Sequence, residues 1–108
     1  MTDRELLEAA ARAAGYEVAS IFPWSDGLHL LPGDGTVGPP WNPLTDDGDA
    51  LWLAVKLRLP IGYASLDGKT NFVTVTTDDG EEWEPEGDDP LAATRRAIVR
   101  AAAEMEQS

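Results

Sequence analysis

The fold is decided by one stretch, residues 61–77, which reads IGYASLDGKTNFVTVTT. Two runs rich in β-branched and aromatic residues flank the pair Asp67-Gly68, which is a strong signal for a tight hairpin turn. The second run alternates apolar and polar side chains, as a strand does when one of its faces is buried. The stretch therefore predicts an antiparallel hairpin, with strands over residues 61–66 and 70–77.

A helix is expected immediately before this hairpin. Thr45 or Asp46 can cap its start, and Pro60 ends it after about Leu59. Its apolar side is expected to consist of Leu51, Trp52, Val55 and Leu59. Because such a stripe is typical of a helix on the surface of a domain, these side chains predict the face that packs inward.

The N-terminal part predicts another helix and another hairpin. Thr2 and Glu5 have the spacing of a capping box, and a helix is expected over residues 2–14. Strands are expected over residues 16–22 and 28–31, followed by a loop rich in Gly and Pro over residues 32–43.

The C-terminal part predicts a third helix. Asp89 can act as its N-cap and Pro90 can occupy its first position. The order of elements is then helix–strand–strand–helix–strand–strand–helix. Residues 1–108 are expected to form a single α+β domain, with one antiparallel sheet of about four strands packed by helices.

Composition narrows the function. The chain has no Cys, which excludes disulfides and thiolate chemistry, and its formal net charge is −12. This charge disfavours direct binding to nucleic acid or to an anionic membrane, and favours a basic protein surface. The N-terminal residues show no signal-peptide pattern and no run is apolar enough to span a bilayer, so the cytoplasm is the expected location.

The densest charge lies in residues 78–89, where eight of twelve residues are acidic and none is basic. This acidic run predicts a surface loop or strand extension, which is either a solvated connection or a partner-facing mimic of nucleic acid. If the run is extended, charges on one face repeat at about 6.6 Å. Duplex DNA carries one charge per about 1.7 Å. One row is therefore too sparse to imitate a duplex. One row of acidic side chains could compete with nucleic acid for a channel that holds a single strand or a guide. It could also act together with a second acidic patch at Asp46, Asp47 and Asp49.

Other side chains are weaker candidates for function. His29 is the one histidine, and because it stands in a short strand of Leu residues we interpret it as a surface or half-buried strand residue. No serine stands in a triad context, which disfavours a hydrolase. The cluster of Asp46, Asp47 and Asp49 lacks the spacing of a calcium loop, so we interpret it as helix capping. Arginines on the terminal helices are expected to pair with carboxylates of the chain itself.

Three segments resemble a known family. They read WNPLTDDGDAL over residues 41–51, LAVKL over residues 53–57 and DPLAATRRAIVRAA over residues 89–102. Together with the opening helix they are similar to a family of small phage and prophage proteins of unknown function. The resemblance implies an accessory gene of a mobile element in a bacterial host, and it implies no activity.

The leading hypothesis is a non-enzymatic phage protein that binds and inhibits a nucleic-acid-handling defence protein of the host. CRISPR effectors and nucleases are the first expected targets, and restriction enzymes the second. No catalytic residue, cofactor or metal is expected. The expected partner-binding residues are Asp78, Asp79, Glu81, Glu82, Trp83, Glu84, Glu86, Asp88, Asp46, Asp47, Asp49 and Trp41. The first alternative is a structural or assembly accessory that self-associates through its helices. The second is an enzyme with a metal at the Asp46 cluster.

Overall fold

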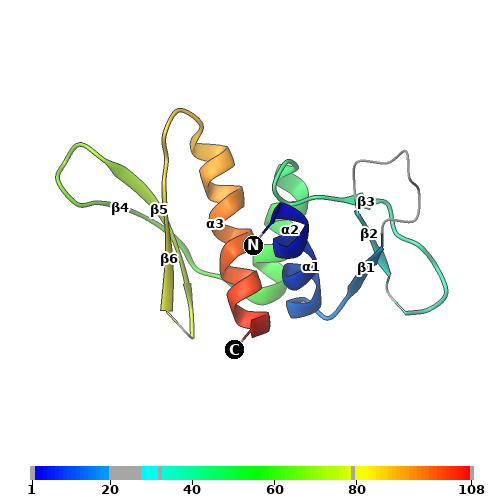
Figure 1. Ribbon diagram of the computed structural model, residues 1–108. Helices are drawn as coiled ribbons and strands as arrows, with labels where there is room; N and C mark the ends of the chain where they lie inside the picture. The colour runs from blue at the N-terminus through cyan, green and yellow to red at the C-terminus, as the bar shows by residue number, and fades with distance from the viewer. Residues whose placement is uncertain (1, 20–27, 32, 79, 108) are drawn as a thin grey trace.

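The computed structural model of the chain describes residues 2–19, 28–31, 33–78 and 80–107. Within these residues, three helices form the centre of the molecule and a three-stranded antiparallel sheet lies on each side (Figure 1). The arrangement is elongated, with principal extents of 50, 29 and 23 Å.

The helices are α1 (Asp3–Ala13), α2 (Asp47–Leu57) and α3 (Pro90–Gln107). The strands are β1 (Glu17–Ala19), β2 (Leu28–Leu31), β3 (Pro40–Trp41), β4 (Ile61–Ser65), β5 (Asn71–Thr77) and β6 (Gly80–Pro85).

Each helix begins at the polar side chain that the sequence predicts. In α1 the capping box forms, because Thr2 Oγ1 accepts from Glu5 N at 3.1 Å and Glu5 Oε1 accepts from Thr2 N at 3.3 Å. Asp46 Oδ1 caps α2 by accepting from Asp49 N at 2.8 Å. Asp89 Oδ1 accepts from Ala92 N at 3.0 Å at the start of α3. The three helix starts are therefore confirmed.

The expected single four-stranded sheet is wrong. The chain forms two separate sheets, ordered β1-β2-β3 and β4-β5-β6. The first gains a strand from an expected loop, and the second gains one from the acidic run, which was expected to be a surface loop or a strand extension. β3 lies within the loop expected over residues 32–43 and pairs with β2. β6 lies within the acidic run and pairs with β5. The first hairpin is confirmed for β1 and β2, while its connection, residues 20–27, lies outside the described part of the chain.

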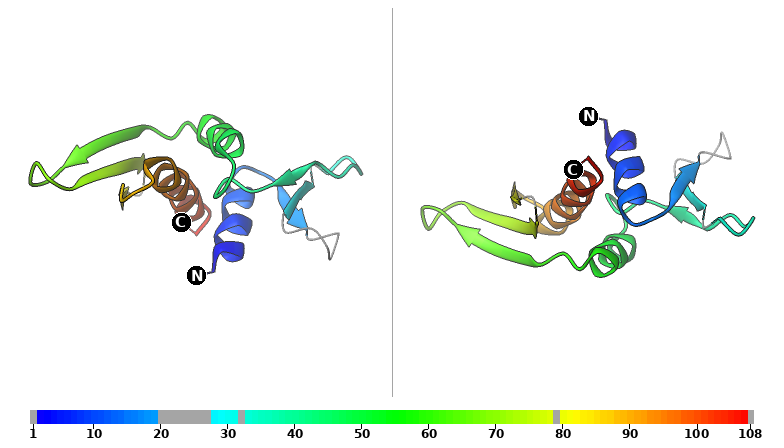
Figure 2. Two further views of the ribbon diagram at one scale, coloured as in Figure 1. Left: turned by 90° about the horizontal axis from the view of Figure 1, so that it is seen from above. Right: turned by 90° about the horizontal axis from the view of Figure 1, so that it is seen from below.

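The helices separate the two sheets because they occupy the space between them (Figure 2). The main core forms where α1, α2 and α3 meet, and α3 also packs on β5 and β6. Val73 and Val75 of β5 are almost fully buried on the face of the sheet toward α3, which we call the inner face. We call the opposite face of the β4–β6 sheet the outer face.

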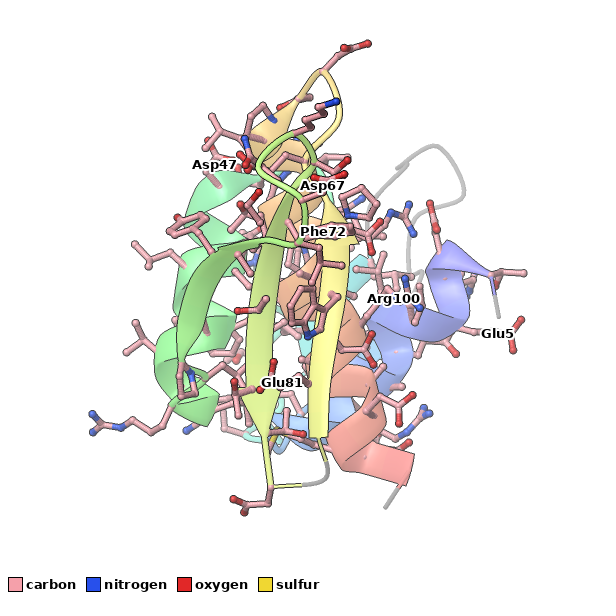
Figure 3. All side chains as sticks on the ribbon, turned by 90° about the vertical axis from the view of Figure 1, so that its left-hand side faces the viewer. Glu5, Asp47, Asp67, Phe72, Glu81 and Arg100 are labelled. Atoms are coloured by element: carbon pink, nitrogen blue, oxygen red, sulfur yellow. The ribbon has the colours of Figure 1, made fainter. Side chains whose placement is uncertain are left out.

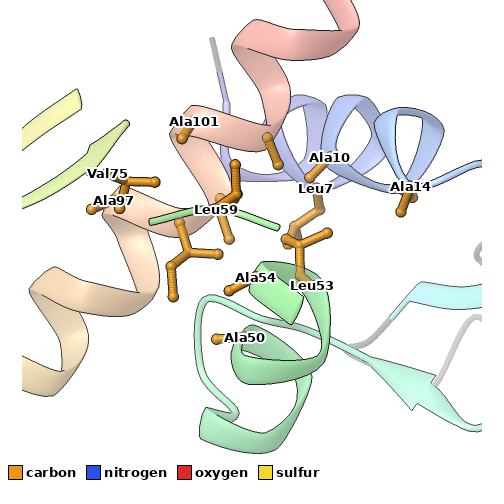
Figure 4. Packing of buried hydrophobic residues seen from close by; sticks show 14 of the residues in the cluster. Leu7, Ala10, Ala14, Ala50, Leu53, Ala54, Leu59, Val75, Ala97 and Ala101 are labelled. Atoms are coloured by element: carbon orange, nitrogen blue, oxygen red, sulfur yellow. The ribbon is translucent and has the colours of Figure 1, made fainter. Parts of the chain in front are cut away.

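The inward face of α2 differs from the expected one. Ala50, Leu53 and Ala54 are buried and point into the core (Figure 4). Leu51 is 62% exposed and Val55 is 60% exposed, although both were expected to pack inward. Small alanines at positions four apart let α2 approach its neighbouring helices closely, and this packing decides which side of the helix is buried.

α2 also ends earlier than expected. Arg58 follows the last helical residue with φ 56° and ψ 45°, which is the left-handed conformation common at helix C-termini. Leu59 N then donates to Ala54 O at 2.9 Å, and the Leu59 side chain is buried. The reversal sends Pro60 and β4 away from the helix.

Candidate functional site

The acidic run does not form one surface, because it follows β6 along the edge of the sheet. Asp78 lies in the turn after β5, the middle residues belong to β6, and the last residues lie in the turn before α3. In the strand, successive side chains point to opposite faces. The run is therefore divided into parts that have different surroundings.

Glu82 and Glu84 lie on the inner face, where their register partners on β5 are Val75 and Val73. The guanidinium of Arg100 on α3 lies between them, with Nη1 at 2.9 Å from Glu84 Oε2 and Nε at 3.7 Å from Glu82 Oε2 (Figure 3). The side chains of these two glutamates are only 21% and 18% exposed. Their charges thus link β6 to α3, and the expected single acidic face does not form.

Trp83 and Glu81 lie on the outer face. The Trp83 ring is 5.6 Å from the Phe72 ring, measured between centroids, and the planes are inclined at 60°. Trp83 Nε1 donates to Glu81 Oε2 at 3.0 Å, and the residue is 39% exposed. Trp83 was expected in a loop, but the strand holds it in a defined position beside one carboxylate.

A small cavity of about 60 Å³ lies near the C-terminal end of α3. It is lined by Thr77, Gly80, Glu81, Glu82 and Glu104. Asp78 is exposed in the adjoining turn, and Asp79 lies outside the described residues. Among the residues that the structure describes, no group of three or more His, Asp or Glu is arranged to hold a metal ion.

A second acidic surface forms at the opposite end of β6. It comprises Asp46 and Asp47 at the start of α2, and Glu86, Asp88 and Asp89 before α3, and we call these residues the acidic end. α2 and α3 both begin at this end of the molecule (Figure 1), and Asp47 lies there in Figure 3. All members are exposed except Glu86, which is partly buried. Tertiary structure thus brings together two acidic clusters that are about forty residues apart in the chain.

The acidic end is held in place by local hydrogen bonds and by Arg95. Asp46 and Asp89 are helix N-caps, so each has one carboxylate oxygen fixed by a backbone N–H. Arg95 Nη1 donates to Asp47 Oδ1, and Arg95 Nε donates to Leu44 O at 2.9 Å. These contacts connect the start of α2 to α3. The capping interpretation of the Asp46 cluster is confirmed.

Two expected partner-binding residues have structural contacts within the chain instead. Trp41 is only 3% exposed and lies edge-on to Trp52, with ring centroids 6.4 Å apart. Asp49 Oδ2 accepts from Asn42 N at 2.9 Å, next to the same strand. Trp41 therefore contributes to the core, and Asp49 holds the segment that joins β3 to α2.

His29 is buried in β2, although a surface or half-buried position was expected. Its Nδ1 lies 3.0 Å from Gly38 O, and because a carbonyl oxygen only accepts hydrogen bonds, Nδ1 is the donor. The segment also lies close to β2, since a Cβ on Gly38 would be only 3.3 Å from Leu30 O. The histidine thus ties the Gly- and Pro-rich segment to β2.

The arginines of the terminal helices pair within the chain, as the sequence predicts. The pairs are Arg4–Glu8, Arg12–Glu106, Arg95–Asp47, Arg96–Asp3 and Arg100 with Glu82 and Glu84. Acidic residues outnumber basic ones by 20 to 8, so these pairs leave a large excess of negative charge.

An apolar surface on β4 was not expected from the sequence. Tyr63 of β4 is 74% exposed and Ile61 is 37% exposed. The uncharged run over residues 59–66 is a sequence signal for this surface. It was not sufficient, because apolar content alone does not distinguish a fully paired strand from an edge strand.

No family model, curated protein or solved structure matches the chain. The resemblance to small phage proteins therefore stays a prediction. Among the described residues, no helix is long and apolar enough to cross a membrane.

Proposed function

We propose that this protein is a non-enzymatic accessory protein of a phage or prophage, which binds a basic surface on a host protein through the acidic end. The host protein handles nucleic acid, and binding blocks its nucleic-acid groove. CRISPR effectors and nucleases are the first target class and restriction enzymes the second. The phage context rests on the sequence resemblance.

The observation that carries the proposal is the gathering of Asp46, Asp47, Glu86, Asp88 and Asp89 at one end of the molecule. Asp46 and Asp89 are held as N-caps and Asp47 by Arg95, so these three carboxylates lose little side-chain entropy when a partner binds. A concentrated field of one sign speeds association with an oppositely charged groove and makes it dependent on salt.

The patch favours a channel for a single strand or a guide over a duplex groove. It occupies one end of the molecule, whereas a duplex presents a continuous double row of charge along its length. Glu82 and Glu84 do not extend it into a row, since both are partly buried on the inner face and share the single positive charge of Arg100. Trp83 lies on the outer face of the same strand and would add apolar contact area for a partner that reaches around the sheet.

A variant that preserves local structure tests the proposal. Asp46→Asn, Glu86→Gln, Asp88→Asn and Asp89→Asn together remove four charges of the acidic end, and Asn still caps both helices. The matched control is Glu5→Gln, Glu17→Gln, Asp34→Asn and Asp78→Asn, which leaves the same net charge. Asp47 is retained in both proteins because it pairs with Arg95.

The measurement is affinity capture from a bacterial lysate at low and at high salt, followed by competition with single-stranded DNA or RNA. The wild-type chain and the control are expected to capture a nucleic-acid-binding protein at low salt only, and the nucleic acid should displace them. The acidic-end variant should capture little. Equal capture by the acidic-end variant and the control would overturn the proposal. A captured protein that nucleic acid cannot release would do the same.

A second candidate function is a structural accessory that self-associates. The exposed apolar side chains of α2 and β4 favour it, because large exposed apolar patches mark interaction surfaces.

A further inference from the structure

β4 is an edge strand whose free edge carries no charge. In the described sheet the order is β4-β5-β6, so β4 and β6 are both edges. β6 contains Glu81, Glu82, Glu84 and Pro85, and charge and proline are the usual means by which proteins prevent an edge from pairing. β4 contains neither, and residues 59–66 form an uncharged segment in a chain of net charge −12.

The backbone of β4 is oriented for pairing with another strand. Thr76 N donates to Pro60 O at 3.1 Å, which makes Pro60 and Thr76 a hydrogen-bonded pair. Bonding alternates along an antiparallel ladder, so Gly62 and Ala64 direct their N–H and C=O groups toward β5. Ile61, Tyr63 and Ser65 then direct theirs toward the free edge.

Apolar side chains lie beside the same edge. Tyr63 and Ile61 are on the inner face, because their register partners are Val73 and Val75. α3 packs on that face over β5 and β6, and the β4–β5 hairpin extends away from the helices (Figure 2). An additional strand next to β4 would therefore lie beside the exposed side chains of Tyr63 and Ile61.

We propose that β4 pairs with β4 of a second copy of this chain, antiparallel and across a two-fold axis at Tyr63. Both Tyr63 residues then form a hydrogen-bonded pair, and Ile61 of each copy pairs with Ser65 of the other. In this register the outward N–H and C=O groups of Ile61, Tyr63 and Ser65 all form hydrogen bonds with the other copy. The two sheets become one continuous sheet, and the interface is the same patch on both copies.

Charge selects a second copy as the occupant. Arg58 precedes β4 and Asp67 follows it. In this register Arg58 of one copy lies opposite Gly68 of the other, one residue away from Asp67. Arg58 makes no ion pair with any residue that the structure describes. The uncharged β4 edge is also where two strongly acidic chains can approach with little repulsion, whereas a basic partner gains nothing there.

The first test is the mass in solution of wild type and of Tyr63→Lys, by sedimentation at concentrations up to about 100 µM. The wild-type chain is expected to have twice the monomer mass of 11.6 kDa. Tyr63→Lys places two ammonium groups face to face at the axis and should weaken the dimer about tenfold or more. The matched control Leu91→Lys changes another exposed apolar side chain, 61% exposed on α3, and should leave the dimer intact.

The second test exchanges charges. Arg58→Glu alone and Asp67→Lys alone should each weaken the dimer several-fold, and the double variant should recover affinity because the pair is restored with opposite polarity. Circular dichroism of each variant establishes that it is folded. Recovery in the double variant cannot arise from a loss of folding.

A wild-type chain that stays monomeric would overturn the proposal, as would a dimer that Tyr63→Lys leaves unchanged. The acidic end lies at the starts of α2 and α3, so its variant should still dimerise. Failure of the dimer and failure of the proposed function are therefore separate results.

Discussion

At the scale of single residues, short acidic side chains set the local conformation by accepting backbone hydrogen bonds. Asp46 and Asp89 each fix the start of a helix. Asp67 Oδ1 fixes the β4–β5 turn by accepting from Lys69 N at 2.8 Å and from Thr70 N at 2.7 Å. Because these bonds span two or three residues, the sequence predicts them well. The acidic composition therefore serves the fold as well as the surface.

The turn residue gives a prediction about pH. The hydrogen bonds from Thr70 and Lys69 hold the pKa of Asp67 below its ordinary value of 3.8. The ionised carboxylate thus stabilises the folded state above pH 3.8, and this contribution is lost as the pH falls through the folded-state pKa. Asp67→Asn keeps an acceptor oxygen but cannot titrate. We expect the stability advantage of wild type over Asp67→Asn to be constant near neutral pH and to shrink below 3.8.

Urea unfolding of both proteins, at neutral pH and in acid, measures this difference. Asp88→Asn is the control. It also removes one charge from a turn, but the Asp88 carboxylate accepts no hydrogen bond from the residues that the structure describes. An advantage of wild type over Asp67→Asn that is the same in acid as at neutral pH would contradict the prediction.

At the scale of elements, β6 shows why an acidic segment can be a strand. Its alternation sends Glu82 and Glu84 toward Arg100 and sends Trp83 toward Phe72. One side of the strand is stabilised by charge and the other by aromatic contact. The sequence shows the alternation, but Arg100 lies sixteen residues beyond Glu84, so local pattern does not reveal the partner.

Arg100→Gln tests this link between β6 and α3. Without the guanidinium, two partly buried carboxylates on one face repel each other, and we expect a loss of about 0.5–1.5 kcal/mol in the free energy of unfolding. Arg96→Gln is the matched control on the same helix. It breaks an exposed pair with Asp3 at 3.4 Å and should cost less than about 0.5 kcal/mol. Denaturant unfolding measures both, and equal losses would show that the Arg100 contacts are worth no more than a surface pair.

α2 illustrates the opposite case, in which an element is predicted correctly and its orientation is not. Its start agrees with the sequence, but Leu51 and Val55 face solvent while Ala50 and Ala54 are buried. Hydrophobicity favours burial of the larger side chains. Close packing between helices favours small ones, and here packing determines the orientation.

At the scale of the whole molecule, the net charge of −12 opposes the compact state. The ion pairs of the arginines lie mostly at the surface, where each is worth about 0–1 kcal/mol. Since the excess of carboxylates is larger than these pairs can neutralise, repulsion should outweigh attraction in the electrostatics of the fold.

Salt is therefore expected to stabilise the protein. Raising NaCl from about 20 mM to about 500 mM should increase Tm by roughly 4 °C, because screening weakens the repulsion. Thermal unfolding followed by circular dichroism measures the shift. The variant with four neutralised charges at the acidic end should show a smaller rise. A Tm that falls with salt would mean that the ion pairs dominate.

The sequence by itself determined the helix starts, the β4–β5 hairpin and the excess of negative charge. These features depend on side chains that contact backbone within a few residues, or on composition alone. Tertiary structure decided the rest: that the hairpins form two sheets, that Arg100 neutralises part of the acidic run, and that Asp46 and Asp47 join Asp88 and Asp89 at one end. Such arrangements depend on how three helices pack between two sheets, and this packing is settled by contacts between residues far apart in the chain.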